Sequence, residues 1–194
     1  MFKKLGLATI VCALGSFAAA DFIDFESDSA GGKPNSWASV SSVNVLFSDT
    51  IGANLGVFDY GVQSIGQALS VDGDDPSMLE MVFSSNVSNL SMVFGNDDPG
   101  FSSPGDLAVL RTYNGATLLG TFSVVLNRDD LANQSILATG SFNRATFSYE
   151  NSSFQAIDLI EIVDNVEFAA VPEPATMTAL GIGALALLRR RRKN

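Results

Sequence analysis

Short apolar stretches alternate with polar, turn-forming residues through most of the chain, between about residues 21 and 170. The apolar stretches are rich in β-branched and aromatic residues, and Gly, Asn, Asp, Pro and Ser separate them, which is typical of antiparallel strands. No stretch here has a sustained helical period with caps. The pattern predicts an all-β domain with strands at 22–26, 40–47, 56–60, 68–71, 79–83, 89–94, 107–113, 117–126, 144–149 and 157–168.

Strict alternation in some of these stretches predicts strands that are buried on one face. Three sets of apolar side chains each share a face: Leu79, Met81 and Phe83; Leu90, Met92 and Phe94; and Leu118, Phe122 and Val124. The dipeptide Asn114-Gly115 predicts a tight type I′ hairpin between two strands, because both residues tolerate positive φ. We therefore expect an antiparallel β-sandwich with a core of Phe, Leu, Val and Ile.

The first 20 residues have the three parts of a secretory signal peptide. Lys3 and Lys4 precede an apolar run at 5–17, and the small residues Ala18 to Ala20 follow it. We expect a signal-peptide helix over residues 1–20 that signal peptidase removes after Ala20. The single cysteine, Cys12, would be removed with it.

The last 24 residues have a different three-part order. The motif Val171-Pro172-Glu173-Pro174 precedes an apolar run at 177–188, and a basic cluster closes the chain: Arg189, Arg190, Arg191, Arg192 and Lys193. The apolar run is short against the roughly 20 residues that usually span a bilayer. Because Lys and Arg beside a membrane segment stay in the cytoplasm, the cluster predicts a stop-transfer signal, with the domain on the outer side of the inner membrane.

This C-terminal arrangement resembles the PEP-CTERM sorting signal, over residues 171–194. The resemblance implies recognition by an exosortase, which cuts near the motif and passes the protein to the cell surface or the extracellular matrix. It also implies a Gram-negative-type bacterium that produces exopolysaccharide. The tail would then hold the chain in the membrane only transiently, through a short transmembrane helix.

Charge and composition narrow the possible functions. The chain has 21 acidic and 11 basic residues, and only four of the basic ones lie between the two ends: Lys33, Arg111, Arg128 and Arg144. Because such an acidic domain repels phosphate backbones, we expect no nucleic-acid partner. The absence of histidine excludes His-dependent general bases and triads, and together with the loss of Cys12 it leaves only oxygen ligands for a metal.

The central domain, residues 21–170, also resembles galactose-binding-like jelly-roll and carbohydrate-binding modules. The residues that carry this resemblance are 22–26 at the start, 113–115 with 118–120 in the middle, and 162–168 at the end. In such modules the first and last strands often hold a structural calcium ion. The resemblance therefore implies a calcium site at Asp24 or Glu26 together with Asp164.

Other candidate groups in the sequence favour structural interpretations. The acidic stretches 72–76 and 96–100 lack the spacing of an EF-hand and consist of turn-forming residues. Glu80 and Glu161 could form the carboxylate pair of a glycoside hydrolase, although alternation places each on a solvent face. A sugar-binding platform would draw on the Trp and Tyr residues, which number four: Trp37, Tyr60, Tyr113 and Tyr149.

These observations favour a non-catalytic structural or adhesion protein at the cell surface or in the exopolysaccharide matrix. A calcium-dependent carbohydrate-binding module is the alternative, and a glycan-active enzyme comes third.

Overall fold

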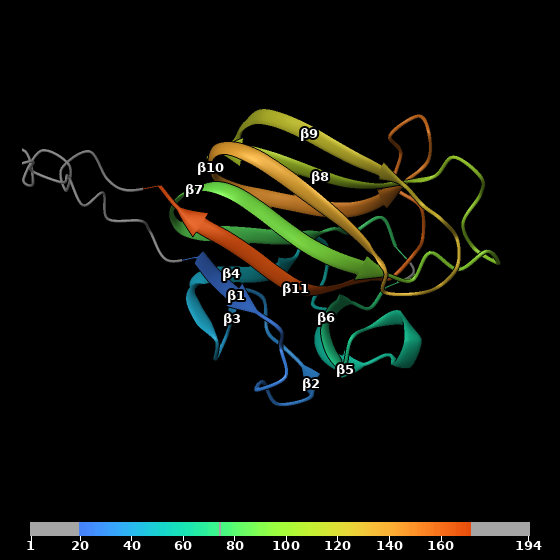
Figure 1. Cartoon of the computed structure of the whole chain (residues 1–194), viewed down its shortest axis with the longest axis horizontal. Coiled ribbons are helices and arrows are strands. Elements are labelled where there is room, and N and C mark those ends of the chain that lie inside the picture. The colour runs from blue at the N-terminus through green and yellow to red at the C-terminus, as the bar shows by residue number, and fades with distance from the viewer. Residues whose placement is uncertain (1–19, 74, 172–194) are drawn as a thin grey trace, which may run out of the picture. The chain divides into compact units, whose positions relative to one another are not determined.

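The computed structural model describes residues 20–73 and 75–171, and these form an antiparallel all-β domain, as predicted (Figure 1). One short 3-10 helix, η1 (Gly61–Gln63), interrupts the strands. The strands are β1 (Ala20–Ile23), β2 (Gly31–Gly32), β3 (Trp37–Ser39), β4 (Ser42–Asp49), β5 (Leu55–Asp59), β6 (Gln67–Val71), β7 (Leu79–Gly95), β8 (Leu107–Asn114), β9 (Thr117–Val125), β10 (Gln134–Glu150) and β11 (Glu161–Ala170). The predicted helices over 1–20 and 171–194 lie outside the described residues, apart from Ala20 and Val171.

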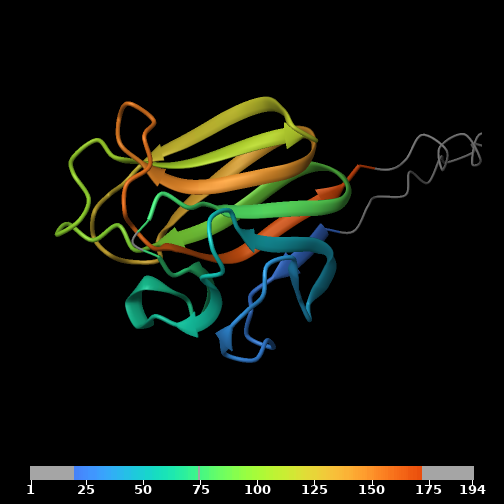
Figure 2. The same ribbon diagram turned by 180° about the vertical axis from the view of Figure 1, so that it is seen from behind.

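Two long strands, β7 and β10, build both layers of the domain. They pair with each other along most of their length. Register shifts lie between Thr139 and Arg144, where both strands bend from one layer into the other (Figure 1). The first half of β7 pairs with β4 and its second half with β11. One layer therefore contains β3, β4, β8 and β9, and the other contains β1, β2, β5, β6 and β11, with β7 and β10 shared (Figure 2).

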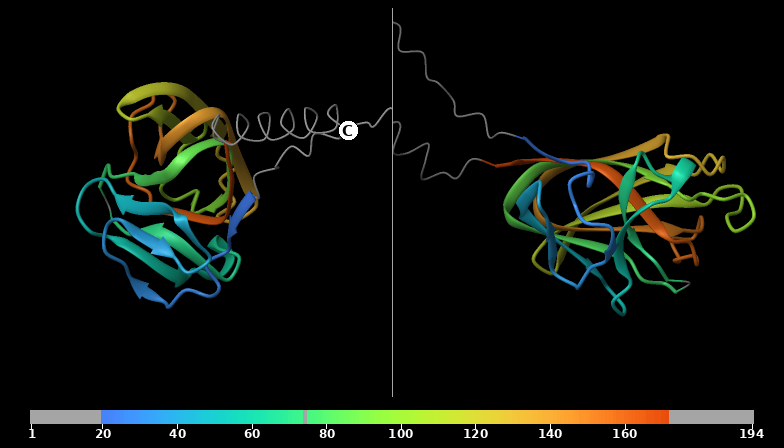
Figure 3. Two further views of the ribbon diagram at one scale, coloured as in Figure 1. Left: turned by 90° about the vertical axis from the view of Figure 1, so that its left-hand side faces the viewer. Right: turned by 90° about the horizontal axis from the view of Figure 1, so that it is seen from below.

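The buried hydrophobic cluster contains residues of both layers, whose ribbons Figure 3 shows from two further sides. Phe83 in the first half of β7 contacts Phe168 of β11, with ring centroids 5.0 Å apart. At the opposite end, Phe94 in the second half of β7 lies 5.7 Å from Phe147 of β10. The buried Tyr149 hydroxyl donates a hydrogen bond to the Gly95 carbonyl, which joins the ends of the two long strands. Aromatic side chains thus fill the space between the layers from end to end.

The predicted alternation is largely confirmed. The sets at 79–83 and 90–94 are buried, and Phe122 and Val124 pack partly against the core. The prediction that Leu118 is buried is wrong, because its side chain is 52% exposed near an irregularity of the β8–β9 pairing. The predicted strands 79–83 and 89–94 are in fact one strand, since the Ser- and Asn-rich stretch between them bends without leaving the sheet.

The β8–β9 hairpin is confirmed, but its turn is displaced by one residue. Asn114 pairs with Thr117, so Gly115 and Ala116 form the loop. Gly115 has φ +57°, whereas Asn114 and Ala116 do not have positive φ. The type I′ assignment is therefore wrong, since that turn needs positive φ at both central residues.

The chain enters and leaves the domain at one end, which we call the exit end. Ala20, the first residue of β1, pairs with Ala169 near the end of β11, and the Val171 N–H donates to the Asn86 carbonyl at 2.7 Å. The strand registers place four connecting segments at the same end: 39–42, 84–89, 113–117 and 139–143. Within the residues that the structure describes, no helix is long and apolar enough to cross a membrane.

Candidate functional site

A row of polar side chains lies on the outer side of β10. After Arg144, the residues Ala145, Phe147 and Tyr149 are buried in the core. Because side chains alternate along a strand, the residues between them point to the opposite face, where β8 is the neighbour. We call this side of the layer the polar outer face, and its members are Glu80, Arg111, Tyr113, Arg144, Thr146, Ser148 and Glu150. Thr146, Ser148 and Glu150 are buried, and the other members are partly exposed.

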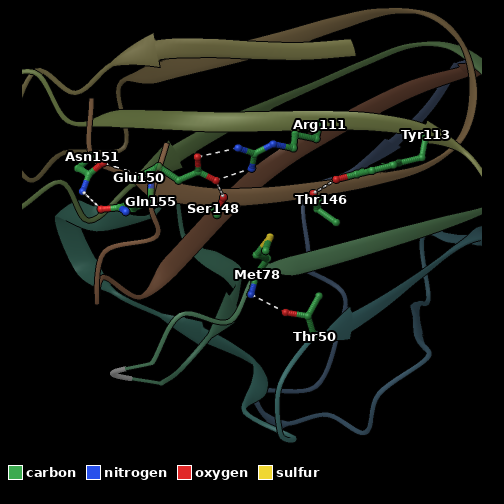
Figure 4. Close-up of polar contacts among 9 residues, drawn as sticks. All are labelled: Thr50, Met78, Arg111, Tyr113, Thr146, Ser148, Glu150, Asn151 and Gln155. Atoms are coloured by element: carbon green, nitrogen blue, oxygen red, sulfur yellow. Dashed lines mark hydrogen bonds and ion pairs between the residues drawn. The ribbon is translucent and has the colours of Figure 1, made fainter. Parts of the chain in front are cut away.

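An ion pair forms one part of the polar outer face (Figure 4). The guanidinium of Arg111 contacts the Glu150 carboxylate with both terminal nitrogens, and the Nη2–Oε2 distance is 2.8 Å. Ser148 Oγ donates to Oε1 of the same carboxylate at 2.7 Å. The hydrogen bond to Glu150 raises the pKa of Arg111. Glu150 is only 2% exposed, and its carboxylate is held by Arg111 and Ser148.

The second part of the polar outer face is a stacked tyrosine. The Arg144 guanidinium lies 4.2 Å from the centre of the Tyr113 ring, a cation–π distance, and Arg144 Nε is 3.5 Å from Glu80 Oε1. The Tyr113 hydroxyl lies 3.5 Å from Thr146 Oγ1 (Figure 4). One ring face is therefore occupied by a cation, and the half-buried ring joins β8 to β10.

The other candidate aromatics pack elsewhere. Trp37 stacks on Phe25 at 6.5 Å, and Lys33 lies over its ring. The Tyr60 hydroxyl donates to Asp72 Oδ1 at 2.6 Å, and burial, reinforced by that carboxylate, raises its pKa. Tyr149 is in the core. Of the four, Tyr113 is the one on the polar outer face.

The three carboxylates of the predicted calcium site come from neighbouring segments. Asp164 is 2% exposed and accepts hydrogen bonds from the backbone N–H groups of Ile65 (3.1 Å) and Asn165 (2.6 Å). Burial raises its pKa to about 6, and the charges of Glu26 and Asp24 add to this rise. Glu26 is itself held by the Gln67 N–H at 2.9 Å. Asp24 and Glu26 thus lie close enough to Asp164 for their charges to act on it.

Their arrangement is not that of a ready-made metal site. Among residues 20–73 and 75–171, no three acidic side chains are grouped as ligands for one ion. The carboxylate oxygens of Asp164 already accept two backbone hydrogen bonds, and Glu26 is exposed. The calcium site at Asp24, Glu26 and Asp164 stays a prediction.

The predicted carboxylate pair, Glu80 and Glu161, is not accessible to a substrate. Glu161 is 2% exposed, and burial raises its pKa well above the ordinary value. Glu80 lies beside Arg144 on the polar outer face. A carboxylate that is sealed in the core cannot reach a glycosidic bond, so this pair does not form an open site.

Carboxylates in the acidic stretches hold loop backbone: Asp97 binds the loop after β9, and Asp75 binds its own turn. Asp97, 1% exposed, accepts the backbone N–H groups of Arg128 and Asp130, the latter at 2.7 Å. Asp75 Oδ1 accepts the Ser77 N–H at 2.9 Å. These are the contacts of turn-stabilising side chains.

A small cavity lies at the exit end. It measures about 110 Å³, and Asp21, Asn44, Phe83 and Phe168 are among its lining residues. Ser42 Oγ and Asn44 Nδ2 hold the Asp21 carboxylate at 2.7 and 2.8 Å. Pockets for small ligands commonly measure about 300 to 1,000 Å³, so this cavity is too small for a sugar.

Sequence reasoning missed the Arg111–Glu150 pair. A signal was present, because Thr146, Ser148 and Glu150 alternate with Ala145, Phe147 and Tyr149, and Arg111 is one of few basic residues in the domain. Of the sorting and cleavage residues, Ala20 is exposed at the start of β1 and Val171 is half-buried after β11. Ala18, Pro172, Glu173, Pro174 and the cluster Arg189 to Lys193 lie outside the described residues.

Comparison with known proteins identifies the C-terminal segment. Residues 170–193 match the PEP-CTERM protein-sorting motif, so the chain carries this motif, which indicates export across the membrane and recognition by an exosortase. No curated protein matches the chain. One solved structure is similar: CsCBM6-3 from Clostridium stercorarium in complex with cellobiose, at 12% identity and a TM-score of 0.35, over 73% of this chain and 99% of that one.

Proposed function

We propose that this protein is an exosortase-processed component of the cell surface or extracellular matrix, with a non-catalytic structural or adhesion role. The observation that carries the proposal is the position of the sorting motif, which begins where the last strand ends, at Ala170. Cleavage near Pro172-Glu173-Pro174 would release the domain with β11 intact. The host would be a Gram-negative-type bacterium that makes exopolysaccharide.

The surroundings of the buried carboxylates support a role without catalysis. Asp97 and Asp164 accept backbone hydrogen bonds, and Glu150 is bound by Arg111 and Ser148. General acid catalysis needs a carboxyl group that contacts the substrate, whereas these groups hold loops and strands together. The domain is therefore best understood as a stable module with an acidic surface.

An experiment in the native host tests this function. The chain with residues 172–194 deleted, the intact chain and the intact chain in an exosortase-deficient strain are compared by immunoblot of cell, surface and medium fractions. We expect processed protein on the surface or in the matrix only with both tail and exosortase. Loss of the gene should reduce biofilm cohesion without changing polysaccharide composition. Processed surface protein from the tail-less chain would contradict the proposal.

The second candidate function is calcium-dependent carbohydrate binding by a jelly-roll-like module. Two observations favour it: the charges of Glu26 and Asp24 raise the pKa of Asp164, an effect that a divalent cation would reverse, and Arg111 and Tyr113 on the polar outer face could hydrogen-bond a glycan. Pull-down on the host exopolysaccharide with and without chelator tests it. Binding that is lost in Tyr113→Ala and in chelator would support this function over a purely structural one.

A further inference from the structure

The exit end of the domain is almost free of charge. Its four connecting segments, 39–42, 84–89, 113–117 and 139–143, contain no Asp, Glu, Lys or Arg and are rich in Ser, Asn, Thr and Gly. The nearest charged groups are Asp21, which is held by Ser42 and Asn44, and Glu167 on β11. Arg144 directly follows the segment 139–143, and its charge is paired with Glu80. Such a neutral surface is unusual in a chain with a net charge of −10.

The opposite end of the same strands is strongly acidic, and we call it the acidic end. It consists of the segments 49–54, 72–73, 75–78, 96–106, 126–133 and 150–160, which adjoin the other ends of the same strands. Their only basic residue is Arg128. Asp49, Asp97, Asp106 and Glu150 among their acidic residues are buried, and the others are at least partly exposed: Asp72, Asp75, Asp98, Asp129, Asp130 and Asp158.

The sorting tail ties the exit end, not the acidic end, to the bilayer. Only residues 172–176 separate Val171 from the apolar run that begins at Met177. Five residues reach at most about 18 Å even when fully extended. The exit end must therefore stay close to the lipid headgroups for as long as the tail is in the membrane.

The length of the strands would keep the acidic end away from the electric field of a membrane surface at the exit end. The second half of β7, from Val87 to Gly95, spans about 26 Å at the usual rise of a strand. The Debye length at physiological salt is about 8 Å, so the acidic end is shifted by roughly three Debye lengths from an anionic surface. In the reverse orientation, its exposed carboxylates, such as Asp129 and Asp158, would face the negative headgroups.

We infer that the uncharged exit end is a membrane-facing surface, which rests against a lipid bilayer containing anionic lipid while the unprocessed chain awaits cleavage. The inference rests on the proposed function, because it requires the sorting tail to be in the membrane. It adds an orientation to that function: the exit end faces the bilayer and the acidic end faces away from it.

Energy transfer to a membrane dye tests this orientation. The full chain carrying Cys12→Ala, which removes the only native cysteine, is reconstituted into vesicles of phosphatidylcholine and phosphatidylglycerol with an acceptor on the headgroups. A donor is attached at Asn114→Cys on the exit end or at Ser152→Cys on the acidic end, both exposed positions. From the two distances, we expect transfer at least about threefold greater from position 114.

Two matched sets of variants test the effect of charge at each end, with energy transfer measured from the donor at position 114. Val40→Asp, Asn86→Asp and Ser141→Asp together add three exposed carboxylates to the exit end, and Ala53→Asp, Ser103→Asp and Ser152→Asp add three to the acidic end. The first set should lower transfer on anionic vesicles but not on pure phosphatidylcholine. The second set should leave transfer unchanged on both.

The outcomes separate the two hypotheses. Equal transfer from positions 114 and 152, in protein that floats with the vesicles, overturns the orientation alone. Equal effects of the two triple variants on anionic vesicles also overturn it. A chain that fails to float with vesicles contradicts membrane insertion of the tail, and with it both the proposed function and the orientation.

Discussion

Ala20 and Ala169 face each other across the antiparallel β1–β11 pair, so the two ends of the domain's chain leave side by side. Signal-peptidase cleavage after Ala20 would fall inside this strand. Because a paired strand cannot enter a protease site in extended form, we expect the signal peptide to be removed before β1 joins the sheet. The exit end is thus where both processing events meet the fold.

The sorting tail gives the first prediction. Replacement of Arg189 to Arg192 and Lys193 by Gln removes the positive charge that holds the chain end in the cytoplasm. We expect precursor to accumulate or to pass through the membrane unprocessed. Immunoblots of fractionated cells measure this, with Lys33→Gln in the domain as the control for a lost positive charge. Normal surface processing of the Gln variant would refute the role of the basic cluster.

The Arg111–Glu150 pair gives a prediction for stability. Arg111→Met leaves the carboxylate of Glu150, which is 2% exposed, with Ser148 as its remaining partner. Removing one member of a buried pair typically costs about 3 to 5 kcal/mol, and we expect the lower part of that range because the Arg111 side chain is 19% exposed. Urea unfolding measures it. Arg111→Met with Glu150→Leu should recover most of the loss; no recovery would mean that the pair acts through something other than its charges.

Gly95 gives a prediction for packing. A Cβ atom at Gly95 would lie 2.1 Å from the backbone carbonyl oxygen of Gln63, whereas one at Gly32 would meet nothing closer than 3.9 Å. Gly95→Ala should therefore destabilise the domain by about 2 kcal/mol or more, because backbone must move. Gly32→Ala should change thermal stability by no more than about 0.5 kcal/mol. Similar melting temperatures for the two variants would contradict the close approach of β7 to η1.

Asp164 gives a prediction for pH dependence. Its pKa is about 6 in the fold, against 3.8 as the ordinary value. The folded state therefore binds the proton more tightly than the unfolded chain, so this contribution to stability is present below pH 4 and is lost as the pH rises to about 6. The difference corresponds to at most about 3 kcal/mol. Carbon-detected NMR of the carboxyl group measures the titration, and a midpoint near 4 would be the contrary result.

The predicted calcium site has a direct test through the same residue. If calcium binds Asp24, Glu26 and Asp164, millimolar calcium should raise the melting temperature at pH 7 and much less at pH 4, where Asp164, with its pKa of about 6, is protonated. Asp24→Asn should abolish the effect, and Asp59→Asn, on an exposed carboxylate of β5, should not. Identical melting curves in calcium, magnesium and chelator would show that the calcium prediction is wrong.

Much of the fold was predictable from local pattern. The faces of Leu79 to Phe83 and Leu90 to Phe94 follow from alternation alone, since burial on one side imposes a period of two. The prediction failed where a single strand, β7, continues through a bend. Ser84 to Ser88 have the composition of a loop, yet they continue β7 around the bend, because the bulges of its partner β10 relieve the curvature there.

The first half of β10 was missed for the same reason. Gly140 and several polar residues hide the alternation of Ile136 and Ala138, which are buried opposite β7.

The candidate site was harder to predict from the sequence than the fold. Arg111 and Glu150 are 39 residues apart in the chain, and only the register of β8 against β10 brings them together. By contrast, the sorting motif was readable in full, because it acts as a linear signal.

The central claim is that the chain is processed at both ends and displayed as a tail-free domain. Intact-mass spectrometry of protein recovered from the surface and medium of the native host measures this most directly. We predict one product that begins at Asp21 and ends at or just beyond Val171, without Cys12 or the cluster Arg189 to Lys193, and its absence from an exosortase-deficient strain. Protein that keeps residues 189–193, or the same product without exosortase, would contradict the account.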